Sequence, residues 1–430
     1  MGSRIGRRVA IVAGLRTPFV KSGSAFKNLS ALDLGRIVTA ELLQRSGIAP
    51  KEIDQVVFGT VIHHVSVANI AREIALAAGL PRTSEAYTVS RACATSLQAL
   101  TSAADAIATG NVDVALVGGT ESMSDVPIGL SRPLAQAMVL ASKGKTVLDK
   151  VKAFSTITAK DVLPVPPAIA EFSTGQSMGE SAEKMAKENG ISREAQDAFA
   201  NRSHTRAAKA WADGTFAQEV MHVLVPPKYE ATSEDNTFRK DSTVEGYAKL
   251  KPVFDRKFGS ITAGNSSPLT DGAAALIVMA EEKAKALGLK PLGYLRSYAY
   301  AGIDPSWQLL QAPAFSVPKV LARAGLRLSD IDLFEVHEAF AAQVLSNLQA
   351  WASRDFAKKH LGGAEPLGEV ADEKLNVHGG SLSLGHPFAA TGARMVTQAL
   401  RELGRTGKQT ALLSICAAGG LGAAMVLERE

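Results

Sequence analysis

The chain contains two cysteines, and both lie in runs of small residues that would let a ligand come close to a thiol. Cys93 lies in the run SRACATS, and Cys416 lies in the run SICAAGG. His386 lies in a third segment of small residues, between a glycine and a proline. A thiolate is a strong nucleophile, and an imidazole held beside a thiol can accept its proton. The sequence therefore predicts that two cysteines and one histidine share a reaction site.

The two cysteines are predicted to lie at different kinds of element. Cys93 directly precedes a helix of small residues over 94–109, where unpaired N–H groups and the helix dipole would lower the pKa of its thiol. Cys416 is expected to follow a buried strand and to precede Gly419 and Gly420, which let a ligand approach the backbone. Each cysteine could instead be a small buried residue that only packs the core.

Two histidines are candidates for polar roles in the same site. His386 is restricted by its flanking glycine and proline, so a fixed imidazole could act as a general base, although a lone histidine is more often structural. His337 and Glu338 leave a strand that should be buried, where an unpaired polar group is costly. A hydrogen-bonding or oxyanion role explains these two residues better than burial alone.

Metal and phosphate sites are not expected. His63, His64 and His378 lack the close Cys/His spacing of zinc sites, so no metal is predicted. Gly118 and Gly119 lack the lysine that follows the glycines of a phosphate-binding loop.

Composition limits the class of protein. With 430 residues, of which 46% are hydrophobic, the chain should form two or three lobes. A net charge of +5 without a long basic run fits an anionic ligand better than a nucleic acid. Cysteine is scarce and no signal peptide is evident, so we expect a reducing cytoplasm. The uncharged segment 410–427 is expected to form two buried strands around a glycine turn rather than a membrane span.

The chain contains two copies of one unit. Residues 43–58 match residues 321–336, and in both a helix ends at a glycine before a short link and a strand. In the first half a second helix then leads into a strand over 112–117 and a turn at Gly118 and Gly119. In the second half a helix over 392–403 and a strand over 409–415 repeat this pattern. Cys93 and His386 thus precede equivalent helices, which a duplicated α/β architecture would bring together.

A segment of about 140 residues, 121–259, has no match in the second copy and is predicted to be an insertion. It should contain helices over 179–189 and 192–213, and a surface loop over 233–237. The segment from Lys143 to Phe154 alternates lysines with apolar residues at helical spacing. It is predicted to be an amphipathic helix that either lies on the body or docks on a partner protein or a membrane surface.

Six segments in order resemble the motifs of one family, the thiolases. The resemblance extends from Arg16 to the C-terminus. The local sequences around His337 and Cys416 are most similar to those of the thiolase β subunit of fatty-acid-oxidation (trifunctional) complexes. The six segments are ACATS at 92–96, GGTESMS at 118–124, TAGNSS at 262–267 with DGA at 271–273, HEAF at 337–340, GHP at 385–387 and CAAGG at 416–420.

The resemblance implies a thiolase-like α/β fold, in which two duplicated α/β halves form a layered α/β/α/β/α core with an inserted loop domain. The N-terminal half would comprise residues 1–120 and 260–280, the insertion 121–259, and the C-terminal half 281–430. It also implies at least a dimer, with a hydratase/dehydrogenase α subunit as a candidate partner.

The implied activity is cleavage of a 3-ketoacyl-CoA by CoA in fatty acid β-oxidation, with no cofactor beyond CoA and acetyl-CoA as substrate and product. Cys93 would be the nucleophile, His386 its base, and Cys416 the second acid and base. His337 with His386 would hold the enolate oxygen of acetyl-CoA. Backbone N–H groups of Cys93 and Ala418 would hold the tetrahedral oxygen.

The resemblance further implies that Ser267 and Met178 contact the pantetheine arm of CoA. Three alternatives stay open: a biosynthetic acetoacetyl-CoA thiolase with the same motifs, a ketosynthase, and a non-catalytic scaffold subunit. A ketosynthase would need a histidine in place of Cys416, and the intact set of candidate residues argues against a scaffold.

Overall fold

A computed structural model describes residues 6–168 and 170–430 of the chain, which divides into two compact units. The large unit comprises Met1–Val61, Asn69–Asp125 and Ala170–Glu430. The small unit comprises Ile62–Ala68 and Val126–Ile169. The domain boundaries expected from the sequence remain a prediction.

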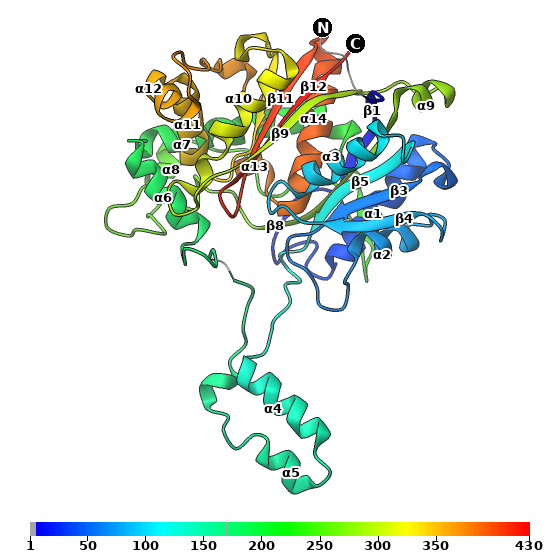
Figure 1. Ribbon diagram of the computed structural model, residues 1–430. Coiled ribbons are helices and arrows are strands. Elements are labelled where there is room, and N and C mark those ends of the chain that lie inside the picture. The colour runs from blue at the N-terminus through cyan, green and yellow to red at the C-terminus, as the bar shows by residue number, and fades with distance from the viewer. Residues whose placement is uncertain (1–5, 169) are drawn as a thin grey trace. The chain divides into compact units, whose positions relative to one another are not determined.

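In the described part of the large unit, ten strands form one sheet (Figure 1). Nine of them run in the order β10-β11-β12-β9-β1-β8-β5-β3-β4, and β2 pairs with β8. The two halves of this sheet meet at β1 and β9, which among the described residues share the pairs Ala10 with Tyr294 and Ile11 with Gly293. The strands are β1 Val9–Arg16, β2 Val20–Lys21, β3 Gln55–Gly59, β4 Glu85–Val89, β5 Val114–Glu121, β8 Thr270–Ala280, β9 Gly293–Gly302, β10 Leu333–Val336, β11 Thr410–Ala417 and β12 Leu421–Glu428; β6 Val223–Val225 and β7 Glu230–Thr232 pair separately.

The strand order confirms the predicted duplication. Starting at β1, the first half runs β1-β8-β5-β3-β4, and starting at β9, the second half runs β9-β12-β11-β10. In the second half, a parallel bridge between Phe334 of β10 and Leu375 occupies the position that β4 occupies beside β3 in the first half. The helices correspond in the same way: α1 Ala31–Ser46, α2 Ile70–Ala77 and α3 Thr95–Ala108 in the first half, α10 Pro313–Ala324, α11 Ala341–Ala352 and α14 Thr391–Thr406 in the second.

The repeated helix-to-strand unit ends its helix in the same manner in both halves. Gly47 follows α1 with φ of 68°, and Gly325 follows α10 with φ of 65°. Only glycine adopts this left-handed conformation at little cost, so each helix stops there and the chain turns into β3 or β10. The prediction from the two matching segments is confirmed, as are the first strand and the strand-turn-strand over 410–427.

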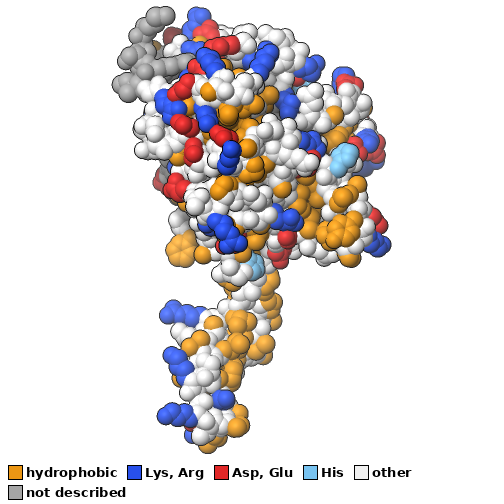
Figure 2. Space-filling model, turned by 90° about the vertical axis from the view of Figure 1, so that its right-hand side faces the viewer, with side chains coloured by type: hydrophobic (Ala, Val, Ile, Leu, Met, Phe, Trp, Pro, Cys, Tyr) orange, Lys and Arg blue, Asp and Glu red, His pale blue; other side chains and the backbone are white. Residues whose placement is uncertain are grey.

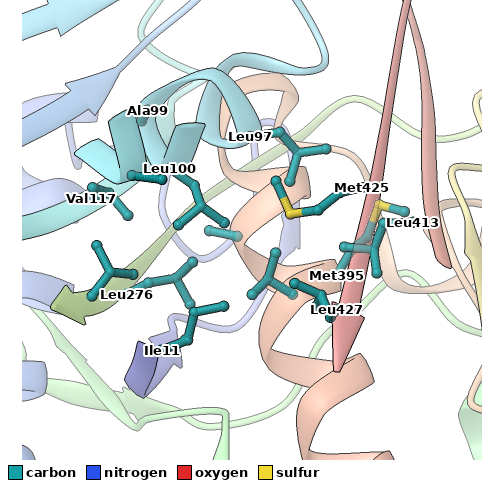
Figure 3. Packing of buried hydrophobic residues seen from close by; sticks show 14 of the residues in the cluster. Ile11, Leu97, Ala99, Leu100, Val117, Leu276, Met395, Leu413, Met425 and Leu427 are labelled. Atoms are coloured by element: carbon teal, nitrogen blue, oxygen red, sulfur yellow. The ribbon is translucent and has the colours of Figure 1, made fainter. Parts of the chain in front are cut away.

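The helices α3 and α14 form the central layer of the core. Their apolar side chains pack between strands of the two halves in one buried cluster (Figure 3). The side chains that Figure 3 labels are Ile11, Leu97, Ala99, Leu100, Val117, Leu276, Met395, Leu413, Met425 and Leu427. The predicted central helical layer between two sheet halves is therefore present.

The outer layers follow from the alternation of side chains along each strand. Ala115 and Val117 of β5 face the central cluster, whereas the Thr120 hydroxyl donates to the Ala31 carbonyl of α1 on the other face. In β10, Phe334 and Val336 pack in a second cluster with α10 and α11. The layers are therefore helix, sheet, helix, sheet and helix.

The predicted turn at Gly118 and Gly119 is wrong, because both glycines lie inside β5 and are buried. A Cβ on Gly119 would lie 2.0 Å from the carbonyl oxygen of Ala389, and one on Gly118 would lie 2.4 Å from that of Ala274. These glycines are needed for close approach of backbones, not for a reversal of the chain.

The predicted helices of the inserted segment are confirmed, with Ser192 capping the second of them. The predicted surface loop over 233–237 is wrong at its centre, because Asp235 is buried and accepts hydrogen bonds of 2.6 and 2.8 Å from Arg16. The remaining helices of the large unit are α6 Met178–Glu188, α7 Arg193–Ala212, α8 Val244–Ala248, α9 Glu281–Ala286, α12 Arg354–Phe356 and α13 Ser381–Leu384.

The small unit contains two short helices, α4 Arg132–Lys143 and α5 Val147–Lys152. The single helix predicted from Lys143 to Phe154 is wrong, because Gly144 ends α4 and Thr146 caps α5. Basic side chains and hydrophobic side chains gather on different sides of this unit (Figure 2). Throughout the described residues, no helix is both long and apolar enough to cross a membrane.

Candidate active site

Cys93 lies in a strained turn between β4 and α3. Ala92 has φ of 43°, which is unusual for a residue with a side chain. The Thr95 hydroxyl accepts from the Arg91 N–H at 2.8 Å and donates to the Ala92 carbonyl at 2.7 Å, so it holds the turn closed. Strain that the surrounding contacts enforce in this way is typical of functional turns.

His386 lies between α13 and α14 and reaches Cys93. Its Nε2 is 3.2 Å from the Cys93 Sγ, and its Nδ1 is 2.7 Å from the Thr391 hydroxyl oxygen. Gly385, with φ of 97°, permits the turn that brings the ring to this position. The thiol and the imidazole are thus within reach of a proton transfer.

The starts of the two central helices meet, as the duplication predicts. The Ala393 N–H of α14 donates to the Ser96 hydroxyl of α3 at 2.9 Å. A Cβ on Gly392 would lie 2.8 Å from the Leu97 Cγ, so only glycine allows α14 to approach α3 this closely. Cys93 and His386 precede these two helices and are brought together by this contact.

Burial makes the resting pair neutral. It raises the pKa of Cys93 to about 12, and hydrogen bonds from the backbone N–H groups of Ala418 and Cys93 itself offset only part of this rise. Burial, together with the charge of Arg394, lowers the pKa of His386 to about 3. The prediction that the helix start lowers the thiol pKa is wrong, because loss of water outweighs the N–H groups. Cys93 is therefore a thiol beside a neutral imidazole.

His337 follows β10 and lies against His386, with 4.2 Å between the ring centroids. Its Nδ1 is 2.9 Å from the Ser381 hydroxyl oxygen, while its buried Nε2 has no hydrogen-bond partner among the described residues. Burial lowers the pKa of His337 well below its usual value, so the ring is neutral. An unpaired buried nitrogen beside the thiol and the second imidazole is available to a bound molecule.

The Sγ of Cys93 and one ring nitrogen each of His337 and His386 lie within 4.8 Å of one another. Among the described residues, this is the one group of three or more His, Cys, Asp or Glu side chains that could hold a metal ion. Each imidazole is oriented by a hydroxyl on its Nδ1, from Ser381 and Thr391 respectively. Such an arrangement suits proton transfer and oxyanion binding as well as it suits a metal.

Glu338 is part of the structure rather than of the reaction site. Its carboxylate accepts from the Ser203 hydroxyl at 2.7 Å, the Asn376 amide at 2.6 Å and the Leu382 N–H at 3.2 Å. Its oxygens are thus occupied inside the protein, and the residue anchors the loop that carries His337.

Cys416 lies within β11 rather than after it, opposite Gly422 of β12. It is buried in a cluster with Ala339 and Phe340. Burial raises its pKa well above the usual value, and the negative charge that Cys93 can carry raises it further. Cys416 is therefore protonated at neutral pH and lies within electrostatic range of Cys93.

Ser267, in the loop before β8, and Met178, the first residue of α6, border the same region. The Ser267 N–H donates to the Ala339 carbonyl at 2.9 Å. Met178 packs against the cluster that contains Cys416 and Phe340. The structure thus gathers the predicted residues from four parts of the chain on the side of the core where α3 and α14 begin.

The sequence did not predict the hydroxyls of Ser381 and Thr391, which orient the two imidazoles, or Glu171, which accepts from the Gly419 N–H at 2.8 Å. Thr391 is five residues from His386, a spacing that has no periodic signature in an irregular turn. Ser381 lies in a glycine-serine segment that reads as an ordinary loop.

The arrangement can perform covalent acyl transfer. A thiol that loses its proton to a neighbouring imidazole can attack a carbonyl carbon. Two backbone N–H groups lie at the same sulfur and could hold the oxygen of a tetrahedral intermediate. A second protonated thiol adds a further acid.

Comparison with known proteins agrees with this chemistry. The family profile "Thiolase, N-terminal domain" matches residues 9–282, and "Thiolase, C-terminal domain" matches residues 289–429. A 3-ketoacyl-CoA thiolase of Yersinia enterocolitica is 54% identical over 428 residues, covering 100% of this chain and 98% of the relative. The 3-ketoacyl-CoA thiolase of Photobacterium profundum is 53% identical with the same coverage.

Solved structures share the fold over the whole chain. An acetyl-CoA acetyltransferase of Bacillus anthracis has a TM-score of 0.83 at 35% identity, covering 99% of this chain and 100% of that one. Human mitochondrial 3-ketoacyl-CoA thiolase also has a TM-score of 0.83, at 30% identity, covering 98% of each chain.

Proposed function

Since the chain belongs to the thiolase family, we propose that it cleaves 3-ketoacyl-CoA with CoA, giving acetyl-CoA and an acyl-CoA shortened by two carbons. The chain is an acyltransferase, and full-length relatives that are 53 and 54% identical carry the name 3-ketoacyl-CoA thiolase. The observation that carries the proposal is the 3.2 Å separation of the Cys93 Sγ from the His386 Nε2, beside the unpaired Nε2 of His337.

In the first half of the reaction, Cys93 attacks the keto carbon while its proton passes to His386. The N–H groups of Cys93 and Ala418 hold the resulting oxyanion, and each such donor stabilises the transition state by about 3 kcal/mol. Collapse of this intermediate leaves the acyl group on Cys93 as a thioester and breaks the carbon–carbon bond. The enolate oxygen of acetyl-CoA is held by His337 with His386, and Cys416 donates a proton to the enolate carbon.

In the second half, the Cys416 thiolate accepts the proton of an incoming CoA thiol. The CoA sulfur attacks the thioester, and the same two N–H groups hold the oxyanion. Collapse releases the Cys93 thiolate, which recovers its proton from His386. The raised pKa of Cys416 suits this order, because the residue begins as the acid that the enolate needs.

CoA is a substrate in this scheme, and no other cofactor is required. Ser267 and Met178 are proposed to contact its pantetheine arm, which would lie along the cluster around Cys416 and Phe340. Loss of these contacts should raise the KM for CoA more than it lowers kcat.

The test is thiolysis by the purified chain with a four-carbon and a sixteen-carbon 3-ketoacyl-CoA, with Cys93→Ala as control. Faster cleavage of the long substrate supports a β-oxidation enzyme, and activity on the short one alone supports the acetoacetyl-CoA alternative. Mass spectrometry adds a second readout: Cys416→Ala should still acylate at Cys93 but fail to turn over. Acylation of the Cys93→Ala protein would contradict the assignment.

We also propose a cytoplasmic homo-oligomer that works with a hydratase/dehydrogenase subunit, and the small unit is the surface on which to look for that contact. Between 126 and 169 the sequence has six basic and two acidic residues, a net charge of +4. Val147, Leu148 and Val151 of α5 are 79, 61 and 64% exposed. Co-purification of a second subunit from native lysate, lost on deleting α4 and α5, would support this assignment; an unchanged complex would contradict it.

A further inference from the structure

A chain of buried hydrogen bonds runs behind His337. The Arg394 Nη2 donates to the Ser381 hydroxyl oxygen at 3.2 Å, and that oxygen lies 2.9 Å from the His337 Nδ1. All three residues are at most 1% exposed, so this chain is shielded from bulk solvent. Ser381 therefore stands between a permanent cation and a neutral imidazole.

The direction of each hydrogen bond follows from the donor inventory of the three side chains. A guanidinium has no acceptor, so Ser381 must accept from Arg394. Among the described residues, the Ser381 hydroxyl has one further partner, the His337 Nδ1. If Nδ1 carried the proton of the ring, the buried serine O–H would have no acceptor, at a cost of about 1–3 kcal/mol. The hydroxyl therefore donates to Nδ1, and the ring proton resides on Nε2.

Arg394 is held in place from behind. Its Nη1 donates to a carboxylate oxygen of Glu335 at 3.3 Å, and the Gln398 amide donates to the other carboxylate oxygen at 3.2 Å. Glu335 points toward α14 because its neighbours Phe334 and Val336 occupy the other face of β10. Burial raises the pKa of Glu335 to about 8, while the charge of Arg394 favours the ionised carboxylate, and Glu335 does not reach Ser381.

We propose that Ser381 and Arg394 are positioning residues that fix the tautomer of His337, so that its Nε2–H points at the substrate oxygen. The inference rests on the proposed function, because it assigns that oxygen to the enolate of acetyl-CoA. Arg394, Ser381 and His337 each donate to the next group in one direction. Successive donors polarise one another, so the Nε2–H becomes a stronger donor to a developing oxyanion.

The hydrogen-bond chain from Arg394 through Ser381 to His337 should affect only the half of the reaction that releases the enolate. Formation and cleavage of the acyl-enzyme with CoA use Cys93, His386, Cys416 and the backbone N–H groups, whereas release of the enolate uses His337. Two assays separate these halves. Cleavage of 3-ketoacyl-CoA requires both, and exchange of labelled CoA into an acyl-CoA requires only the acyl transfer.

The decisive variant is Ser381→Ala, with Ser383→Ala as its matched control. Ser383 is equally buried and lies two residues away, but its hydroxyl contacts the Ser203 hydroxyl at 2.9 Å and the Gly380 carbonyl at 3.1 Å rather than a histidine. Ser381→Ala should slow ketoacyl-CoA cleavage about tenfold to a hundredfold, because it weakens one oxyanion donor, the His337 Nε2–H. It should change the rate of CoA exchange by less than about threefold. Ser383→Ala should leave the ratio of the two rates unchanged. Equal losses in both assays, or no loss in either, would overturn the proposal.

A spectroscopic measurement tests the tautomer without any activity. In protein labelled with ¹⁵N-histidine, the His337 signals, identified by their absence from His337→Asn, should show a protonated Nε2 in the wild type and a mixture in Ser381→Ala. A proton on Nδ1 in the wild type would overturn the proposal. If the chain cleaves no 3-ketoacyl-CoA but shows the expected tautomer, the function has failed and the hydrogen-bond chain has not.

Discussion

Gly392 sets the distance between the two central helices, α3 and α14. Replacing it with alanine adds one methyl group, and this should strongly reduce the rate of thiolysis. The new Cβ would lie 2.8 Å from the Leu97 Cγ, 2.9 Å from the Ser96 Oγ and 3.0 Å from the Leu97 backbone nitrogen. Carbon atoms in ordinary contact are about 3.5–4.0 Å apart, so α14 must withdraw from α3 by about 1 Å. Rotation of the leucine side chain cannot relieve the clash with a backbone atom.

The withdrawal would separate the groups that precede these helices. A misplacement of about 1 Å between a nucleophile and its base costs about a hundredfold in rate. Overpacking a close contact of this kind destabilises a protein by about 1–3 kcal/mol, so the variant should still fold. Gly392→Ala should therefore lower Tm by several degrees. At a temperature below its melting transition, the variant should show a kcat for thiolysis about a hundredfold below that of the wild type.

The control is Gly404→Ala on the same helix. There the nearest atom to a new Cβ is the Arg429 Nε at 3.5 Å, an ordinary contact. Alanine is the better helix former, so this variant should gain about 0.5–1 kcal/mol of stability and keep its kcat. Retention of wild-type kcat by Gly392→Ala, or equal losses in both variants, would refute the reasoning.

The remaining predictions concern proton positions and one buried ion pair. Alkylation of Cys93 by iodoacetamide should accelerate about tenfold per pH unit from about pH 6 to 10, because the pKa of about 12 keeps the thiol protonated there; a plateau in this range would indicate a preformed thiolate. Asp235→Ala should lower the free energy of unfolding in urea by about 3–5 kcal/mol, because it leaves Arg16 buried without its bidentate partner. The exposed Asp213→Ala, by comparison, should stay within about 0.5 kcal/mol, and similar losses in the two variants would argue against the ion pair. Thr391→Val should reduce kcat about tenfold or more while Thr391→Ser retains it, because the hydroxyl orients the His386 imidazole that we propose as the base; equal rates would assign Thr391 to packing alone.

The sequence predicted those parts of the fold that depend on local patterns. The glycines that end α1 and α10 are readable because a left-handed residue after an apolar helix leaves a fixed signature. The same reasoning failed at Gly119, whose role depends on a carbonyl of Ala389 that is 270 residues away. A glycine required for close approach has no local signature that separates it from a glycine required for a turn.

In the candidate site, too, the sequence predicted the features that depend on local residues and missed those that depend on distant ones. Residue type and setting were enough to select Cys93 and His386, and the repeat predicted that they would meet. The pKa of the thiol was not predictable, because it depends on how much water the assembled fold removes. The hydroxyl of Ser381 was not predictable either, because its importance lies in two partners contributed by other elements.

The duplicated unit also divides the reaction pair between its copies. The first copy contributes Cys93 and the second contributes His386, and among the described residues the sheet joins the copies through two residue pairs of β1 and β9. A chain interrupted between α9 and β9, over 287–292, would yield two polypeptides that each carry half of the pair. Turnover would then require that the two polypeptides associate. The protein could therefore serve as a split reporter, in which the rate of thiolysis measures the amount of assembled protein.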